Sequence, residues 1–225
     1  MKGVVATLAV AVAGQVASAS IVGSGGAVSP VALTEGALES DTEIRAITES
    51  INTTLDGRLP LDIMAQEDNE IIDSWDKQLQ NAGGIPGGMA VNSYLLHFDP
   101  TLSPEDYDEE LAEENGVIYD PAGSITFNQD IIGLIVNDDL LDGTDDDFGL
   151  DNMTYPTGMA GRGLELDAGD RVLIGDDLRT LYVELVSGGM DIDQVRVITA
   201  VPEPASLALL GLGGSLMLLR RRKQA

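Results

Sequence analysis

The segment from Asn137 to Asn152, with the sequence NDDLLDGTDDDFGLDN, concentrates side chains that could bind a cation. Its closely spaced carboxylates suit Ca²⁺, which takes roughly six to eight oxygen ligands. An EF-hand loop is excluded, because placing Gly143 at the sixth position puts Gly149 where the bidentate glutamate belongs. Two interpretations stay open. The segment is either a solvated acidic loop between strands or a Ca²⁺ site whose candidate ligands are Asp138, Asp142, Asp145, Asp147 and Asp151.

The single histidine, His97, lies close in sequence to Ser93 and Asp99, a set of residue types that hydrolases use. In a strand, Ser93 and His97 share a face but lie about 13 Å apart. That separation is too large for the hydrogen bond between a nucleophile and its base, and no Gly-x-Ser-x-Gly motif is present. We therefore expect a structural strand histidine, no catalytic residues and no enzyme activity.

The charge and composition of the 225 residues exclude several classes of function. The chain has 12 Lys and Arg against 38 Asp and Glu, a net charge of −26. Nucleic acid is excluded as a partner, because phosphate binding needs a basic surface. The absence of cysteine excludes disulfides, thiolate metal sites and a cysteine nucleophile. No cofactor other than Ca²⁺ is therefore suggested.

The secondary structure that supports these side chains is expected between residues 35 and 200. Short runs alternate polar and apolar residues and are separated by turn residues, which is typical of half-buried antiparallel strands. This spacing predicts an all-β fold, an antiparallel β-sandwich of jelly-roll-like form. The strands are expected at 41–48, 59–65, 92–98, 124–127, 131–137, 163–167, 171–174, 180–186 and 192–199.

Three segments depart from this pattern. The Gly- and Ser-rich start of residues 20–34 predicts a flexible lead-in. Residues 70–81 predict a short helix with Ile71, Trp75 and Leu79 on one face. Residues 103–115 predict a short exposed helix or an acidic loop, since Ser103 and Pro104 are residues that begin helices.

Residues 1–19 have the three parts of a secretory signal peptide in the expected order. Lys2 supplies the positive charge, an apolar run follows, and the small residues Ala17 and Ala19 stand where signal peptidase requires them. We predict cleavage before Ser20, and hence the general export machinery and signal peptidase as partners.

The last 25 residues, 201–225, also have three distinct parts. Pro202, Glu203 and Pro204 cannot form a helix together, so this tripeptide is expected to be extended and open to an enzyme. Residues 205–219 carry no charge and, as a helix, span about 22 Å at about 1.5 Å per residue, a short membrane helix. The cations Arg220, Arg221, Arg222 and Lys223 place that end in the cytoplasm and the body outside.

This ordered tail resembles the bacterial PEP-CTERM sorting signal. The resemblance implies that an integral-membrane exosortase recognises Pro202, Glu203 and Pro204 and cuts near them. Residues 205–219 would then be a transient anchor, and Arg220 to Lys223 its stop signal. The phrases VNSYLLHFDP (91–100), GSITF (123–127) and DIDQVRVIT (191–199) resemble a recurring ectodomain of such proteins, which implies an all-β envelope domain with no established activity.

These observations predict an exported envelope or matrix protein with a structural or binding role, with Ca²⁺ and exopolysaccharide as candidate ligands. The body would lie on the outer face, anchored in the membrane or released after processing. Two alternatives stay open: an extracellular carbohydrate-active hydrolase on a β-sandwich, and a single-pass membrane protein that is never processed. Among the aromatic residues, Trp75, Tyr107 and Tyr155 are expected to be free for sugar binding.

Overall fold

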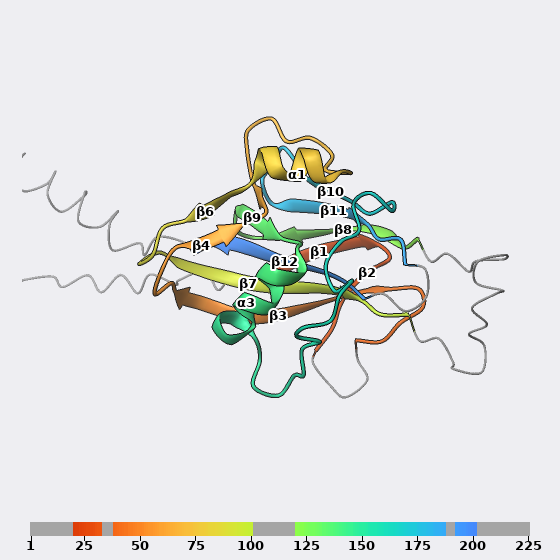
Figure 1. Cartoon of the computed structure of the whole chain (residues 1–225), viewed down its shortest axis with the longest axis horizontal. Coiled ribbons are helices and arrows are strands. Elements are labelled where there is room, and N and C mark those ends of the chain that lie inside the picture. The colour runs from red at the N-terminus through yellow and green to blue at the C-terminus, as the bar shows by residue number, and fades with distance from the viewer. Residues whose placement is uncertain (1–19, 33–37, 101–119, 188–191, 202–225) are drawn as a thin grey trace, which may run out of the picture. The chain divides into compact units, whose positions relative to one another are not determined.

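The computed structural model describes residues 20–32, 38–100, 120–187 and 192–201. All of them belong to one unit, Ala19–Val201, and the described residues are mostly β with two helices (Figure 1). The mostly β character that the sequence predicts is confirmed. None of the helices within these ranges combines the length and apolar character needed to cross a membrane. The predicted signal peptide, the 103–115 segment and the 205–219 helix lie outside the described residues.

One sheet has four antiparallel strands in the order β1-β8-β11-β10. Buried and exposed residues alternate along its strands, because each strand turns one face to the core and the other to solvent. Alternation is clearest in β11, where Leu181 and Val183 are buried and Tyr182 is exposed. The strands are β1 (Ile21–Gly26), β8 (Ala122–Phe127), β10 (Arg171–Ile174) and β11 (Thr180–Glu184).

A second sheet has six strands in the order β2-β3-β7-β12-β9-β5. Its pairs are antiparallel except β2 with β3, which run parallel. The strands are β2 (Val28–Pro30), β3 (Ile44–Thr54), β5 (Ile63–Met64), β7 (Ala90–Phe98), β9 (Ile131–Ile135) and β12 (Asp193–Ala200). A small sheet pairs β4 (Leu59–Leu61) with β6 (Gly83–Ile85).

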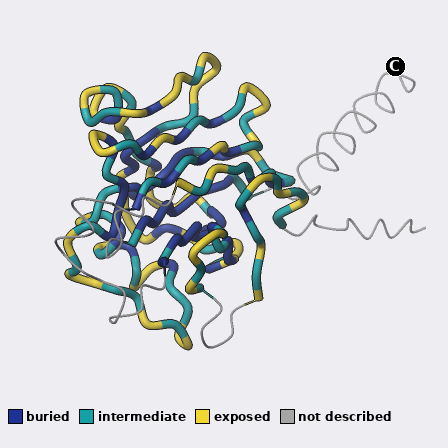
Figure 2. Tube along the Cα trace, turned by 90° about the vertical axis from the view of Figure 1, so that its right-hand side faces the viewer, coloured by how far each residue is buried: buried dark blue, intermediate teal, exposed yellow. Residues whose placement is uncertain are grey.

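Two hydrophobic clusters lie on opposite faces of the six-stranded sheet. The larger one contains buried residues of both large sheets, including Tyr94 of β7 and Phe127 of β8, whose ring centroids are 4.6 Å apart. The smaller one packs Leu141 and Phe148 of helix α3 (Asp138–Phe148) against β3, β7 and β12. Figure 2 shows the buried residues gathered along these strands. The β-sandwich itself stays a prediction.

Most predicted strands are confirmed, with boundaries shifted by a few residues. The predicted strand at 163–167 is wrong, since these residues form bends and turns. Asp138 accepts from the amide of Gly163 at 2.6 Å and Asp170 from that of Glu165 at 2.6 Å, while the amide of Leu164 donates to the backbone oxygen of Val136 at 2.8 Å. Leu164 and Leu166 are both buried, so the alternation that predicts a strand comes from two core contacts of an irregular segment.

The flexible lead-in predicted at residues 20–34 is also wrong, because Ile21–Gly26 and Val28–Pro30 form β1 and β2. β1 pairs with β8 about 100 residues later in the sequence. Its glycine and serine residues have low strand propensity, so the backbone hydrogen bonds to β8 cannot be predicted from the β1 sequence. Gly26 turns the chain between the two strands with a φ of +63°, a conformation that residues with a Cβ rarely adopt.

Helix α1 (Trp75–Asn81) confirms a helix within 70–81, but the predicted apolar face is wrong. Leu79 is 69% exposed, and Ile71, before the helix, is 47% exposed. The buried residue is Gln78, whose Nε2 donates to the backbone oxygen of Asp62 at 3.0 Å. A specific hydrogen bond therefore decides which face of this short helix turns inward.

Candidate functional site

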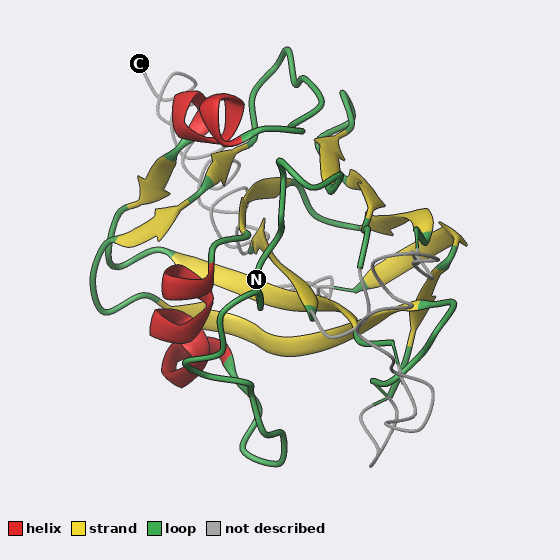
Figure 3. Cartoon of the chain, turned by 45° about the vertical axis from the view of Figure 1, so that its right-hand side comes forward, coloured by secondary structure: helices red, strands yellow, loops and turns green. Residues whose placement is uncertain are grey.

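The acidic segment, for which the sequence leaves a solvated loop and a Ca²⁺ site open, forms helix α3, which lies against the six-stranded sheet (Figure 3). Asn137 caps the first turn by accepting from the amide of Asp139 at 3.1 Å, and Asp138 and Asp139 carry negative charge at the positive end of the helix dipole. Leu141, Thr144 and Phe148 recur at helical spacing and are buried. The interpretation as an acidic loop is therefore wrong.

Three of the five candidate Ca²⁺ ligands share one face of α3 and accept hydrogen bonds from the protein. Asp138 accepts from the amides of Gly161 and Gly163 at 3.1 and 2.6 Å. Asp142 and Asp145 both bind the guanidinium of Arg162, at 2.5 and 2.6 Å from its Nη1. The other two candidates, Asp147 and Asp151, are exposed. A cation at α3 would therefore compete with an arginine that is already in place.

Arg196 of β12 completes this buried ionic network. Its Nε and Nη2 each lie 2.8 Å from an oxygen of Glu49 in β3, and Nη2 also lies 2.9 Å from Asp145. Arg162 and Arg196 are both 0% exposed. Such charges are tolerated in a protein interior only when they are paired and hydrogen-bonded, so the carboxylates of α3 balance two buried arginines.

Polar neighbours satisfy the remaining hydrogen-bonding capacity of Glu49. The hydroxyl of Ser93 donates to Oε2 at 2.7 Å, and the hydroxyl of Tyr155 donates to Oε1 at 3.0 Å. Burial and the negative charge of Glu49 raise the pKa of Tyr155 above its usual range. Tyr155, which the sequence suggests is free for sugar binding, is therefore part of this network.

Sequence reasoning missed the two arginines that organise this site. A signal was present, since Arg196 interrupts the apolar run VRVIT in a chain with only 12 basic residues. An arginine inside a buried strand requires a carboxylate partner. The sequence did not indicate which carboxylate, because Glu49 is 147 positions away.

We expect acid to weaken the body through Asp145. Burial raises the pKa of this carboxyl, but hydrogen bonds and charges of Arg162 and Arg196 outweigh burial and lower the pKa overall. The stabilisation is therefore present above the unfolded pKa of about 3.9 and is lost as the pH falls through the folded value. Thermal midpoints measured between about pH 6 and pH 3 should fall less steeply in Asp145→Asn than in wild type.

The matched control for this pH experiment is Asp151→Asn, which changes an exposed carboxylate in the turn after α3. It should keep the wild-type dependence of the thermal midpoint on pH. Equal slopes for wild type and Asp145→Asn would show that this carboxyl does not couple folding to protons.

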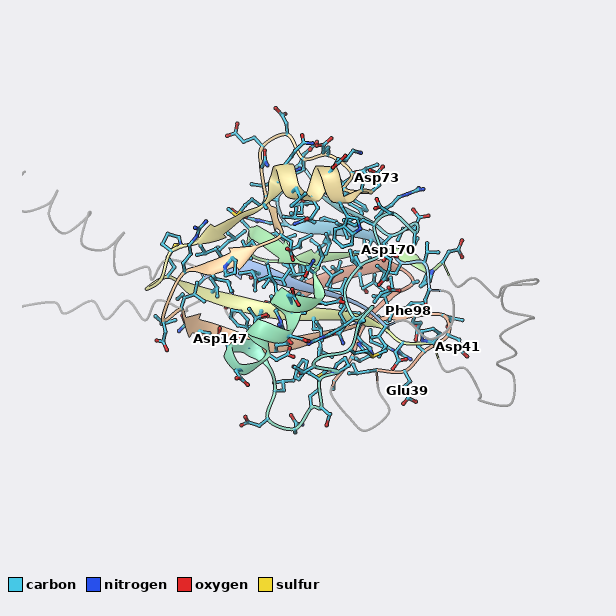
Figure 4. The ribbon with its side chains drawn as sticks, viewed as in Figure 1. Glu39, Asp41, Asp73, Phe98, Asp147 and Asp170 are labelled. Atoms are coloured by element: carbon cyan, nitrogen blue, oxygen red, sulfur yellow. The ribbon has the colours of Figure 1, made fainter. Side chains whose placement is uncertain are left out.

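A separate group of three carboxylates comes from Glu165, Asp170 and Asp193, on or beside the loops that precede β10 and β12. One oxygen of each lies within 4.8 Å of the others, close enough for a single metal ion. Asp170 and Asp193 are 0% exposed, and Asp170 also accepts from the amide of Val186 at 2.7 Å. Figure 4 shows Asp170 well separated from Asp147 of α3, so this group is distinct from the predicted Ca²⁺ ligands.

His97 lies in β7 and is 4% exposed. Its Nδ1 is 2.7 Å from Nε2 of Gln194, and its Nε2 is 3.7 Å from Asp99. Ser93 instead binds Glu49. Ser93 and His97 therefore have different hydrogen-bond partners, and His97 lies in a strand that pairs with β3 and β12.

The two ends of the described body meet the same turn, between β8 and β9. The amide of Ser20, the predicted first residue after signal cleavage, donates to Asn128 Oδ1 at 2.9 Å. The amide of Ala200, the last residue of β12, donates to the oxygen of Asp130 at 2.8 Å. Ordered structure therefore continues to within two residues of Pro202, at the end of a central strand.

Comparison with known proteins identifies this C-terminal stretch. Residues 200–223 match the model of the PEP-CTERM protein-sorting motif, so the match begins at the last residue of β12. No curated protein and no solved structure gives a significant match to the chain. The motif supports export, envelope sorting and an exosortase as the sorting enzyme.

Proposed function

We propose that this PEP-CTERM sorting-motif protein is a structural or binding component of the bacterial surface or its exopolysaccharide matrix, delivered there by an exosortase-type enzyme. The observation that supports the proposal is the motif at residues 200–223. In this account Pro202, Glu203 and Pro204 are the recognition residues, residues 205–219 form a temporary membrane anchor, and Arg220 to Lys223 stop translocation. Cleavage near the tripeptide frees the body.

The charge of the chain supports a role in a hydrated matrix. A net charge of −26 keeps the body solvated and repels copies of the same chain. Cations can bridge such a surface to acidic groups of neighbouring molecules. Exposed carboxylates outside the buried arginine network, such as Glu67, Asp68 and Asp146, are available for these contacts.

Cell fractionation tests the sorting role. Deletion of residues 202–225 should move the protein from the envelope fraction to the soluble exported fraction, because the deletion removes both the recognition residues and the apolar helix. Replacing Arg220, Arg221, Arg222 and Lys223 with alanine should leave the protein exported but poorly processed. Envelope retention that survives the deletion would contradict sorting by this motif.

The intact mass of envelope material separates a processed protein from a permanently anchored one. The proposal predicts a C-terminus near the Pro-Glu-Pro tripeptide and an N-terminus near Ser20. Mature material that still ends in Ala225 would show that residues 205–219 remain as an anchor and that processing does not occur.

We also propose that Ca²⁺ stabilises the body. The support for this is the buried group of Glu165, Asp170 and Asp193, whose oxygens lie within 4.8 Å of one another. Ca²⁺ takes oxygen ligands at about 2.3–2.6 Å, so three carboxylate oxygens this close together can bind one ion.

Millimolar Ca²⁺ is therefore expected to raise the thermal midpoint of the full chain in mild detergent by several degrees over EGTA, since a ligand of the folded state alone adds stability. Glu165→Ala, which removes one carboxylate ligand from a half-buried position, should abolish most of the rise, while Asp147→Asn on α3 should keep it. No rise for the wild type, or a rise that Asp147→Asn abolishes, would contradict this location.

A further inference from the structure

A groove of about 550 Å³ lies on the four-stranded sheet, and the mechanism of sorting does not use it. Residues that line it include Gly25, Ile71, Ser124, Arg171, Tyr182 and Glu184. Its volume falls in the range of small-molecule sites, which are mostly apolar with a few fixed polar groups. The groove therefore has the dimensions and composition of a binding site.

The strand register explains the shape of this groove. Leu173, Tyr182, Ser124 and Gly25 stand directly opposite one another on β10, β11, β8 and β1. Opposed residues of neighbouring strands share a face of the sheet. Side-chain size falls along this row from tyrosine to serine to glycine. Open surface is therefore left over Ser124 and Gly25, beside the ring of Tyr182, and we call this surface the shelf.

Tyr182, which is paired with Ser124, presents an aromatic ring to solvent beside the shelf. Its side chain lies on the outer face of β11 and is 49% exposed. The aromatic residues expected to be free are engaged elsewhere: Trp75 packs against the core, and Tyr155 binds Glu49, while Tyr107 lies outside the described residues. Tyr182, which sequence reasoning did not select, is thus the aromatic side chain that the described body offers a ligand.

Polar side chains on the same face flank the ring. On one side, Arg171 and Glu184 form an exposed pair at 3.4 Å. On the other side, the hydroxyls of Thr126 and Thr180 lie 3.1 Å apart. A flat surface with an exposed ring, small neighbours and hydroxyl, carboxylate and guanidinium groups around it matches a sugar, which has apolar ring faces and a polar edge.

We propose that this groove binds a neutral polysaccharide chain, with one sugar ring over Ser124 and Gly25 and its apolar face or edge against Tyr182. This proposal rests on the proposed function as a matrix component. Neutral chains are favoured over acidic ones by charge, since the chain carries −26 and the one arginine of the groove is already paired with Glu184. Arg171, Glu184 and Ser124 would hydrogen-bond the sugar hydroxyls.

Affinity electrophoresis of the purified full chain in nonionic detergent tests this site. Native gels containing hydroxyethyl cellulose, xylan, dextran or alginate give apparent affinities from the retardation of the protein band. We expect retardation by at least one of the three neutral polysaccharides and none by acidic alginate. Tyr182→Ala should weaken the apparent affinity about tenfold, equal to about 1.4 kcal/mol.

Matched variants separate the roles of the ring and the shelf. Tyr182→Phe keeps the ring and should stay within about twofold of wild type, whereas Ser124→Leu fills the shelf and should weaken binding as Tyr182→Ala does. Leu79→Ala removes an apolar side chain of α1 that is more exposed than Tyr182, and should leave the apparent affinity unchanged. Unchanged thermal midpoints would show that the variants fold.

Several results would overturn the proposal: no retardation in the neutral gels, retardation in alginate alone, or equal affinities for Tyr182→Ala and wild type. A change in oligomeric size for Tyr182→Ala, measured by light scattering, would assign the groove to a second copy of the chain instead. These assays do not involve sorting, so loss of the groove proposal would leave the fractionation test of the sorting motif standing.

Discussion

Replacing Arg196 with methionine is expected to destabilise the folded body by about 3–5 kcal/mol. The side chains of Arg196 and Glu49 are both 0% exposed and meet at 2.8 Å through two hydrogen bonds. The variant leaves the carboxylate of Glu49 buried without its guanidinium partner, and only the hydroxyls of Ser93 and Tyr155 remain. Urea unfolding, followed by the fluorescence of the single tryptophan, Trp75, measures the loss.

A double variant isolates the buried charge as the cause. Glu49→Gln together with Arg196→Met removes both charges, so it should cost less than Arg196→Met alone. Arg179→Met is the exposed control: Arg179 pairs with Asp130 at 2.7 Å, but both side chains are more than half exposed, and such pairs contribute below about 1 kcal/mol. A loss below about 1 kcal/mol for Arg196→Met would show that the network is not needed for stability.

Phe127→Ala is the second change with a large expected effect, a loss of about 3–5 kcal/mol. Phe127 is 1% exposed and comes from the four-stranded sheet, while its neighbour Tyr94 is 0% exposed and comes from the six-stranded sheet. Removing the ring leaves a cavity between residues of both sheets. Urea unfolding of the full chain measures the loss, and the slope of the transition shows whether the variant still unfolds as one unit.

Two further variants control for side-chain volume and position. Phe127→Leu keeps most of the apolar contact and should cost clearly less than Phe127→Ala. Tyr182→Ala changes the outer face of the same sheet and should stay within about 0.5 kcal/mol of wild type. A small loss for Phe127→Ala would argue against a core shared by the two sheets and therefore against the predicted sandwich.

Strands could be predicted where apolar and polar residues alternate within a single short run of sequence. β10 and β11 alternate buried and exposed residues over four and five positions, and that period reports a sheet with one face in the core. β1 carries no such signal, because its IVGSGG sequence pairs with β8 through backbone groups. β1 therefore could not be predicted from its own residues.

The acidic segment was ambiguous for a similar reason. Its aspartates are typical of cation ligands, while the apolar spacing of Leu141 and Phe148 indicates the helix that forms. The partners of those aspartates, Arg162 and Arg196, lie 17 to 51 positions later in the chain. Because these partners are far apart in the sequence, the ion-pair network could not be predicted, although its side chains lie close together in space.

The order of residues along the chain was enough to reveal the sorting motif, because its parts follow one another within residues 200–223. Tertiary structure alone decided which carboxylates face arginines, which three converge, and that Tyr182 rather than Tyr155 is open to solvent. The physical reason is that the motif consists of consecutive residues, so it is visible in the sequence. Charge pairing and side-chain exposure instead depend on strands that come together from distant positions in the chain.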